Sequence, residues 1–366
     1  MTANWPVQPR SEVGGAGAAC LIDHTYLDNG RGVLFCVAGS QHTSTLVAGC
    51  AYYFREDVAE VLRTRCRLAG LSQPATRARP LLYGGRHYWK IDTLTGSTDW
   101  HQVTAQLDPT HGIRPLRWSL LSTLEIKRVR RCIEPRTAVR RGVRQRHGHD
   151  CGQRQLRDLL AALDDPGNRH GHLGLTGSAA LSQIRLCDAE DLDLLLYPSL
   201  PADALRWAIR QCGGQFLADL QSTDARYRRY ADSRTLPATP TQHAQAKLWA
   251  RRYDVAWLGD TRIDLTAVPS RPTILDELPY AATDLGPFHD HGVVATVVPG
   301  YPVWLHLHAG SSLGRTVLVL VTARGYDGVF RPGDHIVVSG RRRGSPERRP
   351  FVSVEDWPGH GLALRA

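Results

Sequence analysis

Residues 172–197, "HLGLTGSAALSQIRLCDAEDLDLLLY", hold the most informative pattern in this chain. Three acidic residues, Glu190, Asp191 and Asp193, stand just before and within the apolar second half of the stretch. Side chains alternate along a β-strand, so the two aspartates are expected to point the same way, with Cα atoms about 6.5–7 Å apart. Two carboxylates placed like this repel each other unless a cation lies between them.

The first half of the stretch predicts a strand at 173–176 and a helix that begins at Ser178. Gly177 leaves room for the backbone to approach a ligand closely. Ser178 supplies a hydroxyl at a helix N-terminus, where backbone amides attract phosphate. A third carboxylate, Asp264, stands between Ile and Leu in a later strand-like segment. The order of these residues predicts a phosphate-binding turn beside a three-carboxylate site for a hard divalent cation.

Each of these elements has a simpler interpretation when it is taken alone. An Asp-x-Asp triplet more often ends a strand or lies in a surface turn, and a lone Gly-Ser is usually part of a turn. The order Gly-Ser, helix, Asp-x-Asp and distant strand aspartate is a more demanding combination. It therefore favours a catalytic site over three unrelated local features.

At these residues the sequence resembles the polymerase-beta-like nucleotidyltransferase superfamily, whose signature is an apolar residue, Gly-Ser, a spacer, Asp-x-Asp and a later isolated carboxylate. A closer resemblance, to a predicted nucleotidyltransferase family common in archaea, extends over most of the chain and includes residues 26–54 and the β-rich C-terminal part. The resemblance implies transfer of a nucleoside monophosphate from an NTP, such as ATP, to an acceptor hydroxyl or phosphate. It implies two Mg²⁺ ions, with Mn²⁺ as an alternative. The metal-binding and catalytic residues would be Asp191, Asp193 and Asp264, and the nucleotide-phosphate grip would be Gly177 and Ser178.

Two basic residues are candidates for further contacts to the nucleotide. Lys247 and Arg251 share one face of a predicted helix upstream of Asp264, because residues four apart are neighbours on a helix. From there they would reach triphosphate oxygens. A solvated helix face is an equally weighted alternative.

The net charge of +10, from 45 Lys and Arg against 35 Asp and Glu, favours a polyanionic partner. The excess is concentrated in segments 127–146 and 341–349. These segments predict RNA, for example a tRNA-like end, as the acceptor, and solvated basic faces are the alternative. The same chemistry on a small molecule or a protein stays open, as does a non-catalytic protein that binds nucleic acid or nucleotides.

The pattern of apolar, Gly and Pro residues along the chain predicts an α+β (mixed α/β) protein of three domains. Residues 1–17 are expected to be a disordered lead-in, and residues 18–149 an N-terminal α+β domain with a basic helical segment. Residues 150–285 would form the nucleotidyltransferase domain. Residues 286–366 alternate short strands with Gly and Pro turns, which predicts a small, β-rich, β-barrel-like domain of OB-like outline.

The composition also bears on location and on metal ligands. No uncharged apolar run approaches a membrane span, and the N-terminus lacks the pattern of a secretory signal, so a cytoplasmic protein with no membrane partner is predicted. Eight cysteines without a C-x-x-C motif fit a reducing compartment. His147, His149 and Cys151 match no common zinc module in their spacing, so a polar loop is the favoured interpretation. The oligomeric state stays open.

Overall fold

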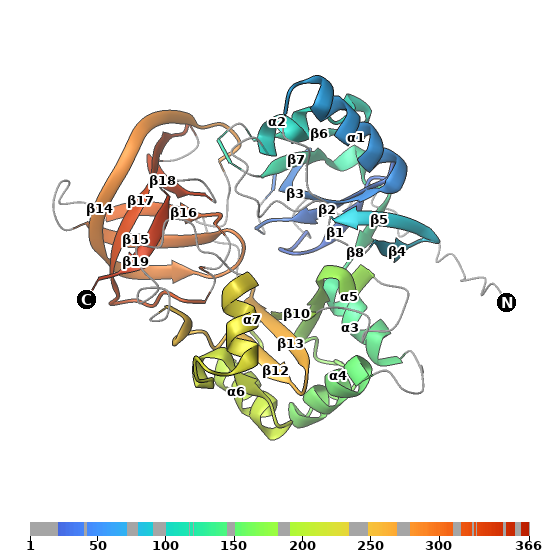
Figure 1. The fold of residues 1–366 in the computed structure, drawn as a ribbon, viewed down its shortest axis with the longest axis vertical. Helices are drawn as coiled ribbons and strands as arrows, with labels where there is room; N and C mark the ends of the chain where they lie inside the picture. The colour runs from blue at the N-terminus through green and yellow to red at the C-terminus, as the bar shows by residue number, and fades with distance from the viewer. Residues whose placement is uncertain are drawn as a thin grey trace.

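The fold is known from a computed structural model, which describes residues 21–39, 42–71, 80–90, 100–116, 118–119, 121–144, 151–181, 191–233, 248–268, 279–309, 316–323, 326, 328–346, 349–355 and 360–365. Within these residues the chain is mixed α+β, with helices α1–α7 and three sheets of eight, five and six strands (Figure 1). The predicted lead-in at 1–17 and Lys247 lie outside the described residues. None of the described helices is long and apolar enough to cross a membrane.

The N-terminal sheet has eight strands. Six of them follow one another in the order β4 (Leu81–Tyr83), β5 (Arg86–Lys90), β3 (Leu46–Arg55), β2 (Val33–Val37), β1 (Tyr26–Asp28) and β8 (Arg131–Ile133). The long strand β3 also pairs with β7 (Ser122–Glu125), which pairs with β6 (Ile113–Pro115). Helices α1 (Glu56–Leu68) and α2 (Trp100–Ala105) belong to this part of the chain. Ala59, Leu62 and Cys66 form the buried stripe of α1, at the spacing that an amphipathic helix requires.

The central sheet carries the residues of the predicted site. Its strands follow the order β11 (Gln215–Phe216), β12 (Val255–Leu258), β13 (Thr261–Ala267), β10 (Asp191–Leu196) and β9 (Leu173–Thr176). Strand β10 is parallel to β13 and antiparallel to β9. The helices around it are α3 (Pro135–Arg144), α4 (Cys151–Ala162), α5 (Gly177–Leu181), α6 (Ala202–Gln211) and α7 (Ala225–Ser233).

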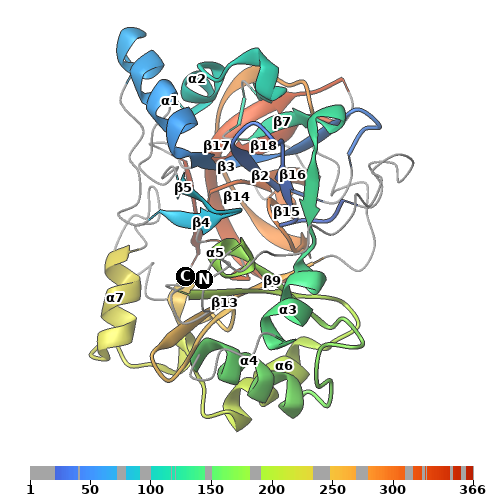
Figure 2. The ribbon, with the colours of Figure 1, turned by 90° about the vertical axis from the view of Figure 1, so that its right-hand side faces the viewer.

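Alternation along β10 gives the two faces of the central sheet different roles. Leu192 and Leu194 are buried and pack in one core with Leu156 of α4 and Leu205 of α6. Figure 2 shows α4 and α6 below the sheet, with the N-terminal sheet above it. The aspartates of β10 therefore face away from the helices and toward the N-terminal sheet.

The C-terminal sheet closes on itself. Its strands follow the order β14 (Thr283–Val298), β15 (Val303–Ala309), β16 (Thr316–Val321), β18 (Phe351–Val354), β17 (His335–Gly344) and β19 (Gly361–Leu364). Because β14 pairs with both β15 and β17, five of the strands form a ring, and its only parallel pair among the described strands is β16–β18. Tyr326 and Phe330 are buried in the interior of the ring, whereas Trp304 is buried in a second core that includes residues of the other two units. None of these three aromatic rings is exposed for base stacking.

All three sheets contribute to one shared core. Leu181 of the central unit belongs to the same buried cluster as Trp118 of the N-terminal unit and Trp304 and Phe351 of the C-terminal ring. The Phe351 ring lies 5.6 Å from Trp118 and 5.7 Å from Trp304 between centroids, both edge to face. The units are thus packed against one another through apolar side chains.

The prediction of a basic helical segment is wrong for the first part of that segment. After β7, residues Ile126–Arg128 form a single 3-10 turn, and Arg131–Ile133 form strand β8, which pairs with β1. The helix α3 begins only at Pro135, a residue whose fixed φ suits the first turn of a helix. The pairing with β1 is a contact about a hundred residues away in sequence, and local propensity does not report such contacts.

Candidate active site

Three aspartates converge on the face of the central sheet that is turned toward the N-terminal sheet. Asp193 of β10 lies directly between Thr176 of β9 and Asp264 of β13 in the strand register. Asp191, Asp193 and Asp264 each offer a carboxylate oxygen, and these oxygens all lie within 4.8 Å of one another. The cluster is therefore close enough to share one cation.

Gly177 brings the end of β9 up against this cluster. Its φ is +65°, a left-handed conformation that favours glycine. A Cβ atom at this position would lie 1.9 Å from Oδ2 of Asp193, so no other residue fits without displacing the carboxylate. Ser178 follows at once and is half-buried. The Gly-Ser turn and the carboxylates are thus parts of one local arrangement.

A cation of the chain itself, Arg262, lies between the carboxylates. Nη2 of Arg262 donates to Oδ2 of Asp264 at 3.0 Å and also to Oδ2 of Asp191. Burial lowers the pKa of Arg262, but the charges of Asp264 and Asp191 outweigh it, so the net shift of this pKa is upward. Arg262 is not among the predicted site residues, although a signal for it is present in the sequence: Arg262 and Asp264 are two apart on β13, and alternation places them on one face.

One arginine does not neutralise three carboxylates. Burial, followed by repulsion from Asp191 and Asp264, raises the pKa of Asp193 to about 7. The cluster therefore holds a proton near neutral pH in the absence of any further cation. A divalent ion would replace that proton, because it relieves the same repulsion.

A cavity of about 120 Å³ opens beside the cluster. Gly177, Asp193 and Asp264 form part of its wall from the central sheet. The N-terminal sheet and the loop before β15 supply the opposite wall, with His24, Tyr26, Cys36, Val37, Cys50, Tyr52 and Tyr301. A molecule bound here would contact all three units of the protein and the carboxylates at once.

The predicted nucleotide-binding arginine lies elsewhere. Nη1 of Arg251 forms an ion pair with Oδ2 of Asp334 at 2.7 Å, in the turn before β17, and Arg251 is not in the cavity wall. Its neighbour Arg252 does line the cavity and is buried in an ion pair with Asp254 at 2.5 Å. Helical spacing predicts that Arg251 lies on a helix, but the described helical residues end at Trp249 and Arg251 lies in the turn that follows.

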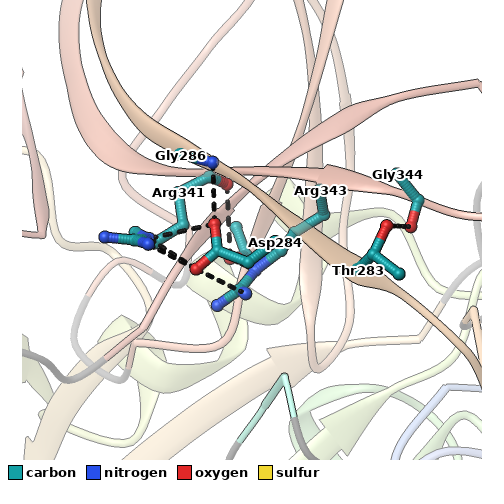
Figure 3. A network of polar contacts seen from close by, with 7 residues as sticks. Thr283, Asp284, Gly286, Arg341, Arg343 and Gly344 are labelled. Carbon is teal, nitrogen blue, oxygen red and sulfur yellow. Dashed lines mark hydrogen bonds and ion pairs between the residues drawn. The ribbon is translucent and has the colours of Figure 1, made fainter.

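The basic segment 341–349 is partly neutralised within the barrel. Figure 3 shows Asp284 of β14 between two arginines of β17. Its carboxylate accepts hydrogen bonds from Nε of Arg341 at 3.0 and 3.2 Å and lies 3.6 Å from Nη1 of Arg343. Arg343 is buried and also donates to Oγ of Ser353 at 3.0 Å. These two arginines thus hold β14 and β17 together.

Arginines of segment 127–146 are also used within the fold. The guanidinium of Arg136 stacks on the ring of Tyr197 at 3.8 Å from its centroid. Arg140 donates to the backbone oxygen of Asn168 at 3.2 Å, and Arg141 donates to that of Ala180. Part of the charge that favoured a polyanionic partner is therefore committed to internal contacts.

No protein-family model matches the chain, and no curated protein matches it. The arrangement of the carboxylates, the Gly-Ser turn and the cavity is therefore the basis for assigning a function.

Proposed function

We propose that this protein is a nucleotidyltransferase, which moves a nucleoside monophosphate from an NTP to an acceptor hydroxyl or phosphate and releases pyrophosphate. The observation that carries the proposal is the convergence of Asp191, Asp193 and Asp264 beside Gly177, at the wall of a cavity. The residues that converge here are those on which the resemblance to nucleotidyltransferases is based, and this supports the proposal.

The carboxylates fit Mg²⁺, with Mn²⁺ as the alternative. Their donor atoms are all oxygens, which hard divalent cations prefer. Burial, and then repulsion from Asp191 and Asp264, raises the pKa of Asp193 despite the nearby Arg262, so a further positive charge would stabilise the ionised cluster. Asp191, Asp193 and Asp264 would hold two ions, which supply charge stabilisation for the attacking and leaving oxygens.

The residues of the chain then have separate tasks. The turn at Gly177 and the hydroxyl of Ser178 hold the phosphates of the NTP. Asp264 takes the proton of the acceptor hydroxyl as the acceptor oxygen bonds to the α-phosphorus, and the bond from that phosphorus to pyrophosphate breaks. The cavity wall positions the acceptor and keeps water from the α-phosphorus.

RNA is the acceptor that we favour. The closed five-stranded ring with one parallel pair resembles an OB-fold, a fold that often binds single-stranded nucleic acid. The pairing of Arg341 and Arg343 with Asp284 favours the alternative of a small acceptor, since it leaves less charge for phosphate contacts. Salt dependence separates the two, because RNA affinity that depends on several phosphate contacts falls steeply as salt rises.

A non-catalytic nucleotide-binding protein is the second candidate. The position of Arg262 between Asp191 and Asp264 favours it, since an internal cation already lies where the proposal needs metal. Under this alternative Mg²⁺ would not bind to the carboxylates. The effect of Mg²⁺ on the affinity for NTP would then be the same in Arg262→Gln as in the wild type.

The test of the proposal is label transfer. Purified protein is incubated with Mg²⁺, each α-labelled NTP, and either total RNA or a small-molecule extract, and labelled product and pyrophosphate are measured. The wild type should label one acceptor class, and Asp191→Ala/Asp193→Ala should abolish labelling. Asp203→Ala, which removes an exposed carboxylate on α6, is the matched control and should retain full activity. Equal labelling by wild type and the double variant would overturn the assignment.

A further inference from the structure

A second group of metal-ligand side chains lies at the other end of β9 from Gly177. Asp165, His170 and His172 stand in the connection between α4 and β9. One ligand atom from each lies within 4.8 Å of the others. The group contains two imidazoles, which distinguishes its chemistry from that of the three-carboxylate cluster.

The strongest sign of a ligand is the buried carboxylate. Asp165 is only 1% exposed. Its Oδ1 accepts from the backbone N–H of His170 at 3.1 Å and lies 3.2 Å from Nδ1 of the same residue. Its Oδ2 is also buried, and within the described ranges it has no hydrogen-bond partner. Leaving a buried carboxylate oxygen unpaired is costly, and a bound cation would remove that cost.

The two histidines complete an arrangement that an ion can enter. The ring centroids of His170 and His172 lie 5.4 Å apart. The His170 side chain is 67% exposed, so the group opens to solvent on that side. Nδ1 of His172 lies 3.0 Å from Oγ of Ser199, in the turn after β10. A hydrogen bond at one ring nitrogen is the usual way in which a protein orients a metal-binding histidine.

We propose that Asp165, His170 and His172 form a zinc site that is separate from the proposed active site. Two imidazoles and one carboxylate suit Zn²⁺, whereas Mg²⁺ prefers oxygen ligands alone. Three protein ligands leave the fourth tetrahedral position to water. The ion fixes the α4–β9 connection and, through Ser199, the turn after β10. It thereby supports both strands that carry the Gly-Ser turn and the Asp-x-Asp triplet.

The experiment uses the full chain, which is first stripped of metal with a chelator. The protein is then titrated with Zn²⁺ as the probe, in a buffer that contains excess Mg²⁺. Competition with a chromophoric chelator should show one tight equivalent of Zn²⁺, and Co²⁺ in its place should give the intense visible bands of a tetrahedral site. His170→Ala and His172→Ala should each weaken Zn²⁺ binding at least about 10-fold and abolish these bands. Zn²⁺ should raise the Tm of the wild type and not that of either variant.

The chain offers a close sequence control. The tetrapeptide Arg-His-Gly-His at 169–172 also occurs at 146–149. His147→Ala/His149→Ala should keep the tight equivalent of Zn²⁺, as should Asp191→Asn/Asp193→Asn, which alters the carboxylate cluster. Loss of Zn²⁺ in either control, or its retention in His170→Ala/His172→Ala, would overturn the proposal. If the His172 variants do not fold, the exposed His170 decides the matter, since His170→Ala removes a ligand from the surface.

Discussion

At the scale of single residues, the site is organised by charge compensation. Three carboxylates share one face of a sheet, and Arg262 offsets part of their repulsion. Burial, together with the remaining repulsion from Asp191 and Asp264, raises the pKa of Asp193 to about 7. Such a cluster is unfavourable for stability alone, since apolar residues would pack there at lower cost. Its presence is more readily explained by a ligand that is positively charged.

Gly177→Ala tests the close approach between the turn and the carboxylates. The new Cβ would lie 1.9 Å from Oδ2 of Asp193, so the carboxylate must move. We expect a loss of nucleotidyl transfer of about 100-fold or more, because misplacement of about 1 Å at a reacting centre has that effect. Gly213→Ala is the matched control: its φ is +76°, but no atom lies within 4 Å of its added Cβ. Both variants should lose about 1–2 kcal/mol in urea unfolding from left-handed strain, and only Gly177→Ala should lose activity.

The stability of metal-free protein should depend on pH through Asp193. Its pKa is raised to about 7 when folded, compared with about 3.9 in an unfolded chain. Between these values the folded state holds a proton that the unfolded state lacks. The free energy of unfolding should therefore fall as pH rises from about 4 to about 7, by at most about 1.4 kcal/mol per pH unit.

The measurement is urea unfolding in a chelator at several pH values. Asp193→Asn cannot ionise, so its profile over this window should be flatter than that of the wild type. Saturating Mg²⁺ should likewise flatten the wild-type profile if the cluster binds the ion. Identical profiles for wild type and variant in chelator would show that Asp193 does not titrate in this range.

At the scale of elements, strand alternation was the most reliable guide. It predicted that Asp191 and Asp193 share a face, and the burial pattern along β10 confirms this. The same rule would have identified Arg262, had it been applied to β13. Segment 127–146 shows where such rules fail, because β8 exists by pairing with β1 and local propensity carries no trace of that contact. The pairing of β10 with β13 is likewise a tertiary contact. Local patterns do not predict it, and it is expected here from the family resemblance.

The pairing of β14 with β17 yields a prediction at this scale. Asp284→Ala would leave Arg341 without its carboxylate and the buried Arg343 with one partner fewer. Exposed ion pairs contribute little, so we expect a loss of about 1 kcal/mol in urea unfolding, mainly from Arg343. Asp203→Ala removes an exposed aspartate that pairs with Arg206 along α6 and should cost under about 0.5 kcal/mol. A cost for Asp284→Ala no greater than that of the control would mean that the network does not hold the barrel together.

At the scale of the whole molecule, the cavity exists because three units meet. Its walls come from the N-terminal sheet, the central sheet and Tyr301 in the loop before β15. The shared core around Phe351 fixes the units in place. Composition and local residue patterns do not predict this packing, because the contacts join residues more than two hundred positions apart in the sequence. The function that we propose therefore depends on the assembled molecule and not on the central sheet alone.

Asp23 is the polar counterpart of that shared core, and it provides the last prediction. It is fully buried and accepts hydrogen bonds from the backbone N–H of Gly39 at 3.0 Å and from that of Tyr301 at 2.8 Å. Asp23→Ala would remove one hydrogen bond from each of these N–H groups, although Gly39 still donates to the backbone oxygen of Tyr301 at 2.8 Å. We expect a cost of about 1–3 kcal/mol and a less firmly held Tyr301 at the cavity wall. We therefore expect a lower Tm together with a raised KM for the acceptor. Asp28→Ala is the control, because Asp28 accepts from Gly30 and Tyr83 within the N-terminal sheet alone. It should lower the Tm and leave KM unchanged, whereas equal effects of the two variants on KM would show that Tyr301 does not shape the acceptor site.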